Sequence, residues 1–330
     1  MHLELVVPAL LATQPMPRLP ALELLRARGR ATRDAPRALE RWLAHAFGVT
    51  EEPLAAGALT LLADGGEPAD GYWMRADPVH LKVGPDRLAL VPVAACGIER
   101  PEADALTATL NGHFGGDYTL LALHPERWCL RAARDLVLEA PSPAELASDA
   151  AGGILPRGAG ARRAHALMNE IQMLLHEHPV NLQREQRGAP AINSVWLWGA
   201  GRLPQGVRGP WQSVMSDDPV ALGLARLAGV RPAASPQTAS QWLERPPQDG
   251  RHLCVLDAVH AARAIDDDDS VLRSLDALEQ RWFVPLLAAL RQGRIGMLSV
   301  NIPDAGESWE TTRADLRRFW RRPRPLAARP

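Results

Sequence analysis

The sequence predicts an α/β protein, because segments with strand-like and helix-like hydrophobic patterns alternate along its 330 residues. Two segments carry most of this prediction. Residues 192–198 (INSVWLW) form a short apolar run before two glycines, which is typical of a buried parallel strand. Residues 161–177 place alanines, leucines and an isoleucine at helical spacing. A chain of this length suits one large domain or two ordinary ones.

The first half of the chain contains short elements. Strands are predicted at 2–7 and 86–94, and two strands at 117–130 around a turn at His124-Pro125. Helices are predicted at 20–29, ending at Gly29, at 35–47, and at 101–112, where a proline occupies a tolerated early position.

The second half has stronger patterns. The helix at 161–177 should end before Pro179, because the residue before proline disfavours helical geometry. A helix at 219–229 should follow Asp217 and Asp218, whose charges suit a helix N-terminus. A long helix is predicted at 270–291, strands at 192–198, 252–256 and 295–302, and loops at 231–239 and 244–251.

Composition excludes several classes of protein. Acidic residues (38) and basic residues (37) nearly cancel, so the chain has no global field for nucleic acid. No apolar run approaches the roughly 20 residues of a membrane span, and Glu4 precedes the apolar residues 5–12 where a signal peptide carries positive charge. The widely spaced Cys96, Cys129 and Cys254 indicate neither disulfides nor a zinc site. We therefore expect a cytoplasmic protein without a membrane partner.

The most specific motif is HEHPVNLQREQRGAPAINSVWLWGAGRLP at 176–204. It resembles the cofactor-independent phosphoglycerate mutases of the archaeal type, in which a His-Pro-Val-Asn turn precedes an Arg, an Ala-Asn pair and a strand ending Trp-Leu-Trp-Gly-x-Gly. The chain is also similar to bacterial proteins described as regulators of pathogenicity factors, type E. The matching residues are His178, Pro179, Asn181, Arg184, Gly188, Pro190, Asn193, Trp196, Trp198, Gly199 and Gly201.

Weaker similarity covers most of the chain. The segment 73–80 resembles the family's Arg-x-Asn segment, with Arg75 kept and Asp77 in place of Asn. The segment 124–130 resembles its Tyr-Arg-His segment, with Arg127 kept.

The resemblance implies a domain organisation. It implies an alkaline-phosphatase-like core, a mostly parallel sheet flanked by helices, formed by 1–70 and 141–316. A smaller α/β lid is expected to be inserted at 71–140. We expect residues 317–330 to form a flexible tail rich in Arg and Pro.

The chemistry that the resemblance implies needs two divalent cations and a serine nucleophile, because a hydroxyl is a weak nucleophile without a metal. The first strand should end in Asp-Gly but is followed by Pro8 and Ala9. No serine precedes Ser142, and Thr32, Thr50 and Thr60 have no matching context. The sequence therefore predicts no catalytic residues.

Few metal ligands remain. The last strand should end Asp-His and instead has Asn301 and Ile302, while Asp257 and His260 remain of the implied set. They indicate either a residual single-metal site for Mn or Zn or a solvated loop. Since two ligands cannot hold a pair of cations, we expect no cofactor.

Three arginines that match family arginines suggest an anion site. Guanidinium forks suit phosphate and carboxylate, so Arg75, Arg127 and Arg184, with His178 and Asn181, are the predicted ligand-binding residues. The alternative is that the arginines form structural ion pairs. The resemblance also suggests that His178 organises its turn through a hydrogen bond.

Loss of the first Asp, the serine and the final Asp-His favours a non-catalytic, regulatory relative of the mutases that binds a small phosphorylated or carboxylated ligand or a protein partner. The alternative is an active metal-dependent phosphoglycerate mutase, a glycolytic isomerase, or a phosphatase with a relocated site. A third hypothesis is nucleic-acid binding through the tail from Arg317, against which the neutral net charge argues.

Overall fold

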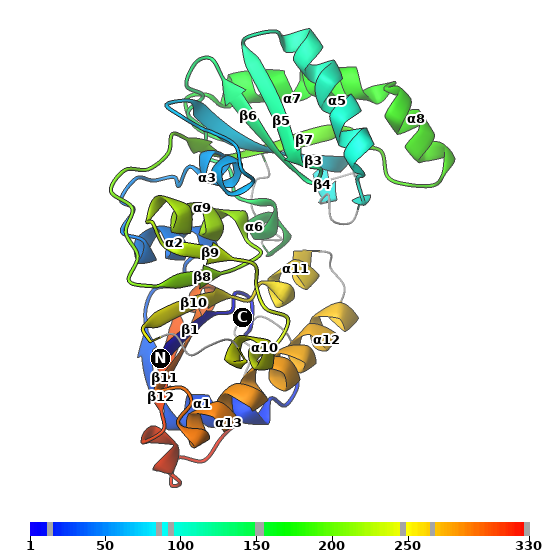
Figure 1. The fold of residues 1–330 in the computed structure, drawn as a ribbon. Helices are drawn as coiled ribbons and strands as arrows, with labels where there is room; N and C mark the ends of the chain where they lie inside the picture. Colours follow the sequence, from blue (N-terminus) through cyan, green and yellow to red (C-terminus); the bar gives the residue numbers. More distant parts are fainter. Residues whose placement is uncertain are drawn as a thin grey trace. The chain divides into compact units, whose positions relative to one another are not determined.

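The structure is a computed structural model that describes all residues except 12–15, 84–87, 92–95, 149–154, 245–248, 265–267 and 327–330. The chain forms two compact units (Figure 1). The first unit combines Met1–Gly48 with Val207–Pro330, and the second unit, Val49–Gly206, is inserted between them. No helix among the described residues has the length and apolar character needed to cross a membrane.

The first unit is built on a mostly parallel sheet with the strand order β2-β12-β11-β1-β10-β8-β9. The five strands from β11 to β9 pair in parallel, whereas β12 is antiparallel to both β11 and β2. The predicted α/β class with a mostly parallel sheet is thus confirmed. The strands are β1 (His2–Val6), β2 (Arg30–Arg33), β8 (Ser213–Met215), β9 (Arg231–Ala233), β10 (Arg251–Val255), β11 (Met297–Ile302) and β12 (Glu307–Thr312).

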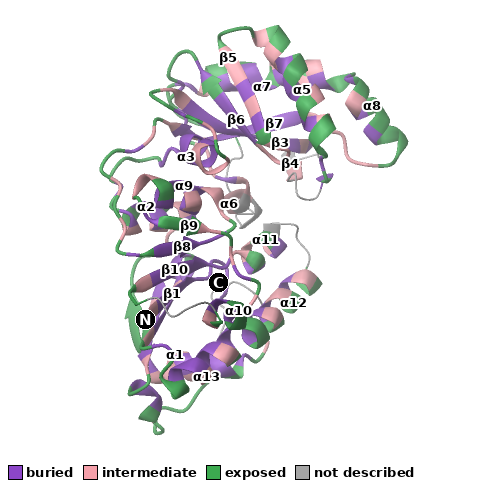
Figure 2. Cartoon of the chain, viewed as in Figure 1, coloured by how far each residue is buried: buried purple, intermediate pink, exposed green. Residues whose placement is uncertain are grey.

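Helices cover this sheet and enclose its core. One face of the sheet contributes Leu3, Leu5 and Val300 to a hydrophobic core shared with α1, α12 and α13. The central strands are buried along most of their length (Figure 2). The helices are α1 (Pro20–Arg28), α2 (Leu39–Ala46), α9 (Pro219–Leu227), α10 (Ala239–Leu243), α11 (Ala258–Ala264), α12 (Asp268–Leu278) and α13 (Val284–Gln292).

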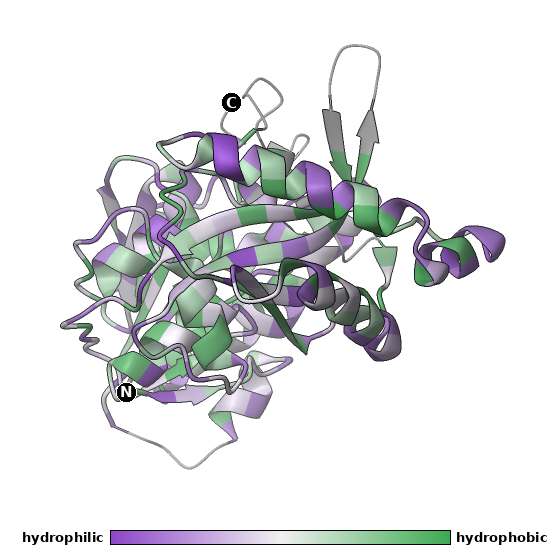
Figure 3. Ribbon diagram, turned by 90° about the horizontal axis from the view of Figure 1, so that it is seen from above, coloured by the Kyte–Doolittle hydropathy of each residue, from purple (hydrophilic) through white to green (hydrophobic). Residues whose placement is uncertain are grey.

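The inserted unit has its own sheet in the order β4-β3-β6-β5, with β7 on the other side of β3. Helix α3 contacts β3, β6 and β7, and α7 packs on β7. Helices in this view carry hydrophobic bands beside hydrophilic ones (Figure 3), as expected of helices that cover a sheet. The elements are α3 (Ala56–Ala63), β3 (Tyr72–Val83), β4 (Leu88–Val91), α5 (Arg100–Phe114), β5 (Tyr118–His124), β6 (Arg127–Ala132), α6 (Pro143–Ser148), α7 (Ala161–His176), α8 (Pro179–Gln186) and β7 (Ser194–Gly201).

Strand β7 corrects one prediction. The run 192–198 is a buried strand, as expected, but it pairs antiparallel with β3 and does not belong to the parallel sheet. Its apolar character has another cause, because α3 and α7 both pack on it. A strand covered by helices is apolar throughout whatever the direction of its partner.

The predicted helix 270–291 is interrupted. Helices α12 and α13 are joined by a π-helical turn, Glu279–Phe283, which ends just before Pro285. Proline has no N–H and its ring clashes with the carbonyl four residues earlier, which favours a wider turn there. The predicted loop 231–239 contains β9 and the first residue of α10, and the strand predicted at 86–94 is β4, with 84–87 and 92–95 outside the described residues.

The unit boundaries differ from the expected lid at 71–140. The inserted unit extends to Val49 and Gly206 because α3, α7, α8 and β7 all pack around the β3 sheet. The described part of the expected tail is mostly exposed but anchored to α1. Arg318 Nη1 donates to the Arg28 carbonyl (3.1 Å), Arg321 Nη1 donates to the Gly29 carbonyl (2.9 Å), and Leu326 is buried.

Candidate functional site

Ligands of open α/β sheets bind at the carboxyl ends of parallel strands, where loops of neighbouring strands meet. In the first unit, β1 is followed there by Pro8 and Ala9. Ala9 has a left-handed backbone (φ 62°), and its N–H donates to Asp304 Oδ1 (2.8 Å) just after β11. The carboxylate of Asp304 therefore fixes a strained alanine, at the strand end where the family resemblance implies a metal ligand.

Carboxylates follow β8 and β10 at the same edge of the sheet. Asp218 Oδ1 accepts from the Ala221 N–H (2.8 Å) and caps α9, and Asp217 Oδ1 accepts from the Ser235 N–H (3.3 Å). Burial raises the pKa of Asp257 to about 6, with a further contribution from the charges of Asp218 and Asp217. Asp217 and Asp218, whose charges act on Asp257, thus both hold local backbone structure. His260 lies on α11, three residues after Asp257.

Asn301, on the last parallel strand, faces a buried carboxylate. Its Nδ2 donates to Glu4 Oε1 (3.0 Å) and, more weakly, to the Leu5 carbonyl (3.4 Å). The other oxygen of Glu4 accepts from Trp211 Nε1 (2.8 Å) and Arg251 Nε (3.0 Å). The amide nitrogen of Asn301 therefore acts as a hydrogen-bond donor within the sheet, and Oδ1 is the one atom of this side chain that could ligate a cation.

The donor set at this edge does not fit a pair of divalent cations. Two such cations need about six oxygen or nitrogen ligands that converge. In the part of the chain that the structure describes, no three His, Cys, Asp or Glu side chains are grouped so that they could hold a metal ion. We therefore derive no catalytic step through a metal.

The threonine hydroxyl groups between β1 and Arg75 that the structure describes are not placed as nucleophiles. Thr60 is fully buried in α3, where its Oγ1 accepts from Arg75 Nη1 (3.2 Å). Thr32 lies on the edge strand β2 and Thr50 is exposed. A fourth threonine, Thr13, follows β1 and lies outside the described residues.

Of the predicted anion-binding residues, Arg75 is buried in an ion pair. Its Nε donates to Asp77 Oδ1 (2.8 Å), and Trp198 Nε1 donates to the other oxygen of Asp77 (2.7 Å). The guanidinium carbon of Arg75 lies 5.3 Å from the centre of the Trp198 ring. The Asp that replaces the family's Asn is thus the partner that allows this arginine to be buried.

Arg127 lies close to this pair and is more accessible. Its Nη2 is 2.7 Å from Asp64 Oδ1, and 28% of its side chain is exposed. Asp64 is the C-terminal cap of α3, the same helix that offers Thr60 to Arg75. The structure therefore brings Arg75 and Arg127 together around α3.

Arg184 is not part of this pair. It is fully buried on α8, where its Nη1 is 2.6 Å from Glu102 Oε2 and its Nη2 donates to the Cys96 carbonyl (2.5 Å). Its Nε donates to the Pro190 carbonyl (2.8 Å), ahead of the start of β7, whereas Arg75 pairs with Trp198 toward the end of that strand. Their partners thus lie toward opposite ends of β7.

His178 and Asn181 hold the turn between α7 and α8. His178 Nδ1 accepts from the Val180 N–H (3.2 Å) and caps α8, as the resemblance suggests, and burial lowers the pKa of its imidazole. Asn181 is buried and makes three bonds. Its Nδ2 donates to the carbonyls of Leu175 (2.8 Å) and Ile192 (2.9 Å), and its Oδ1 accepts from the Ile192 N–H (2.8 Å). These side chains position the chain before β7.

A hollow in the inserted unit is acidic. It has a volume of about 680 Å³ and is lined by Glu51, Glu52, Asp70, Asp135 and Arg202, among others. Arg202 is 2.6 Å from Asp135 and stacks on Tyr72. The predicted arginines do not line this cavity, and no sequence motif indicated it.

No protein-family profile matches the sequence. Curated proteins match over short stretches. Over 51 residues the chain is 45% identical to a probable 2,3-bisphosphoglycerate-independent phosphoglycerate mutase of Geobacter sulfurreducens, covering 16% of this chain and 13% of that protein. Over 113 residues it is 30% identical to the 2,3-bisphosphoglycerate-independent phosphoglycerate mutase of Methanosarcina barkeri, covering 33% of this chain and 28% of that protein. The matches thus span less than a third of these relatives.

Solved structures extend the likeness in fold to nearly the whole chain. The PH0037 protein of Pyrococcus horikoshii superposes with a TM-score of 0.56 over 94% of this chain and 86% of its own, at 14% identity. A cofactor-independent phosphoglycerate mutase from Thermoplasma acidophilum superposes with a TM-score of 0.42, too low to add to the argument. The fold is therefore a shared α/β architecture. The sequence matches indicate a distant relationship to the cofactor-independent phosphoglycerate mutases over part of the chain.

Proposed function

We propose that the chain is a cytoplasmic, non-catalytic relative of the cofactor-independent phosphoglycerate mutases, with an alkaline-phosphatase-like ancestry and a regulatory role. It would bind a small phosphorylated or carboxylated ligand or a protein partner. The observation that carries the proposal is the hydrogen bonding of Asn301, whose amide donates to Glu4 at the end of the last parallel strand. An amide NH₂ group that donates to a carboxylate cannot ligate a cation, which leaves only the neutral Oδ1 of Asn301 where the resemblance implies Asp and His.

Two further observations support the same proposal. Asp304 and Asp218 at this edge accept backbone N–H groups of Ala9 and Ala221, which commits them to the local fold. Thr60, a hydroxyl before Arg75, is fully buried and cannot reach a substrate from solvent. Phosphoryl transfer depends on a positioned nucleophile and on electrostatic stabilisation of the transferred group, and these side chains supply neither.

Turnover by the full chain tests the proposal. Conversion of 3-phosphoglycerate to 2-phosphoglycerate, and hydrolysis of a simple phosphate ester, are measured with added Mn²⁺ or Zn²⁺. We expect no turnover above that of buffer. Turnover with stoichiometric metal that is lost in Asp257→Ala or in Thr13→Ala, but kept in the control Glu185→Ala, would overturn the proposal in favour of an active enzyme with a relocated site.

The ligand part of the proposal is tested separately. Arg127 is partly exposed, whereas Arg75 and Arg184 are buried, so Arg127 is the arginine of the three that a ligand can reach with least rearrangement. We expect 3-phosphoglycerate to raise the melting temperature of the wild type and to raise it less in Arg127→Gln. Arg131→Gln, an exposed arginine on the same strand, is the control. Equal shifts in both variants would refute an anion site at Arg127.

A further inference from the structure

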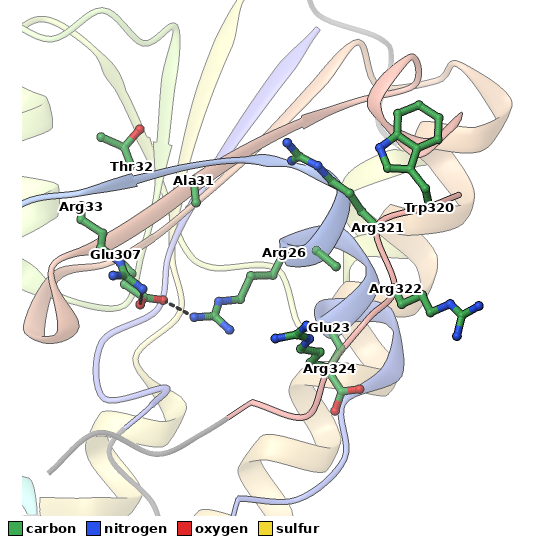
Figure 4. Close-up of a pocket in the computed structure, with 11 residues that line it drawn as sticks. Glu23, Arg26, Ala31, Thr32, Arg33, Glu307, Trp320, Arg321, Arg322 and Arg324 are labelled. Atoms are coloured by element: carbon green, nitrogen blue, oxygen red, sulfur yellow. Dashed lines mark hydrogen bonds and ion pairs between the residues drawn. The ribbon is translucent and has the colours of Figure 1, made fainter. Parts of the chain in front are cut away.

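An arginine-rich cavity of about 490 Å³ lies in the first unit (Figure 4). Five arginines line it, namely Arg26 on α1, Arg33 on β2, and Arg321, Arg322 and Arg324 on the C-terminal segment. Its volume falls within the range of about 300–1,000 Å³ that is usual for small-molecule sites. These residues come from segments almost 300 positions apart in the sequence, so only the fold brings them together.

Two glutamates also line the cavity, and both are already paired. Glu23 is held by Arg18, which does not line the cavity, through bonds of 2.8 Å (Nε to Oε1) and 2.7 Å (Nη2 to Oε2). Glu307 lies 2.9 Å from Arg26, the ion pair dashed in Figure 4, and 3.6 Å from Arg33. The positive charges of the lining exceed the negative charges by three.

The arginines of the C-terminal segment supply this excess. Arg321 Nη1 donates to the Gly29 carbonyl (2.9 Å), which anchors the side chain but offsets no charge. Within the described residues, Arg322 and Arg324 have neither a hydrogen bond nor an ion pair. Guanidinium groups gathered around one hollow repel one another, so an anion bound there lowers the free energy of the folded state.

Two exposed aromatic residues, Phe319 and Trp320, precede these arginines on the C-terminal segment. Trp320 lines the cavity with 66% of its surface exposed, and its ring meets Phe319 edge to face at 5.3 Å. Figure 4 shows Trp320 and Arg321 on the same C-terminal segment, with their side chains extending in different directions. A large exposed indole next to arginines is suited to stack on a planar ring of a ligand that carries negative charge.

We propose that this cavity binds a nucleotide, with its phosphates on Arg321 and Arg324 and its base on Trp320. Planar guanidinium forks bind phosphate oxygens in pairs and with direction, which a single point charge cannot do. The site shares no residue with the arginines of the inserted unit. Its occupancy does not depend on whether the chain is catalytic, so it goes beyond the proposed function.

A small ligand fits better than a strand of nucleic acid. The arginines of α1, β2 and the C-terminal segment line one cavity, whereas a nucleic-acid strand is bound by charges that follow it along a groove. The formal net charge of the chain is −1, which gives no general attraction for a polyanion. The cavity is therefore the local exception in a nearly neutral protein.

Calorimetric titration of the full chain with ATP and with inorganic triphosphate, at low and high salt, tests the proposal. We expect both to bind at one site per chain and more weakly in high salt, because screening weakens the contacts. Arg324→Gln and Arg321→Gln should each weaken both ligands about tenfold. Trp320→Ala should weaken ATP and leave triphosphate unchanged, which separates the base from the phosphates.

Arg317→Gln is the matched control. It removes the same charge from an exposed neighbour that does not line the cavity, and it should leave both affinities nearly unchanged. Arg324→Gln is the decisive variant, because Arg324 has no partner among the described residues and its loss should not unfold the protein.

Three results would overturn the assignment. The first is no binding of ATP or triphosphate at millimolar concentration. The second is an equal loss of affinity in Arg317→Gln and Arg324→Gln, which would indicate non-specific attraction. The third is much tighter binding of a single-stranded oligonucleotide than of ATP, which would indicate an extended polyanion. None of these results bears on the turnover assay of the proposed function.

Discussion

The side chain of Asn181 holds two segments of the inserted unit together, and its replacement by alanine should lower the stability of the protein substantially. The substitution removes the partner of both the N–H and the carbonyl of Ile192, which are bonded at 2.8 and 2.9 Å. The third partner, the Leu175 carbonyl, keeps a bond from the His178 N–H (3.3 Å) and adds little. A buried polar group without a partner costs about 1–3 kcal/mol, so two such groups should lower the free energy of unfolding by about 2–6 kcal/mol.

Urea denaturation of the wild type and the variant, followed by tryptophan fluorescence, measures this loss. Gln183→Ala removes the same type of amide from an exposed position on the same helix, and it should change stability by less than about 0.5 kcal/mol. A loss in Asn181→Ala no larger than that of Gln183→Ala would refute the reasoning. A large loss would mean that Asn181, a predicted ligand-binding residue, matters through folding.

Two further substitutions test the first unit. Burial raises the pKa of Asp257 to about 6, above its value in the unfolded chain. Ionisation of this carboxyl therefore lowers the free energy of unfolding, and the loss is complete above about pH 6. Asp257→Asn should therefore be more stable than the wild type at pH 8, by at most about 3 kcal/mol and less with partial exposure. The gain should nearly vanish at pH 4, where the carboxyl of Asp257 is mostly protonated. An equal gain at both pH values would show that the buried charge of Asp257 is not the reason for it. Glu279 accepts a hydrogen bond from the N–H of Ala21 (2.6 Å) and so caps the start of α1. Glu279→Ala should therefore lower the free energy of unfolding by about 1–2 kcal/mol, measured as a lower melting temperature. Glu279→Gln keeps an acceptor and should lower the melting temperature less.

The sequence could predict the elements whose pattern reflects burial. The helix 161–177 and the strands 2–7 and 295–302 follow from apolar spacing, and the structure confirms them. The edge strand β2 could not be found in this way, because all four of its residues are exposed and carry no alternation. Strand β12 was missed because buried Glu307 and Thr311 interrupt its apolar pattern.

Partners far apart in the sequence lay beyond prediction. The apolar run of β7 indicates burial but not the direction of its neighbour, which depends on β3 more than a hundred residues earlier. The arginines at 75 and 184 were identified from resemblance, but their partners were not. The sequence shows where an arginine stands, whereas the carboxylate that neutralises it depends on which segments the fold brings next to it.

The residues that carry the family resemblance most strongly are occupied in holding the inserted unit together. His178 caps α8, Asn181 joins the end of α7 to the start of β7, and Arg184 joins α8 to α5 through Glu102. All three are buried and bonded within the protein, so the motif indicates a shared scaffold. The family resemblance implies phosphoryl transfer at the carboxyl edge of the other sheet, where Asn301 and Asp304 bond to the protein itself. A scaffold can therefore retain its sequence motif independently of the chemistry, because the two depend on different residues in different units.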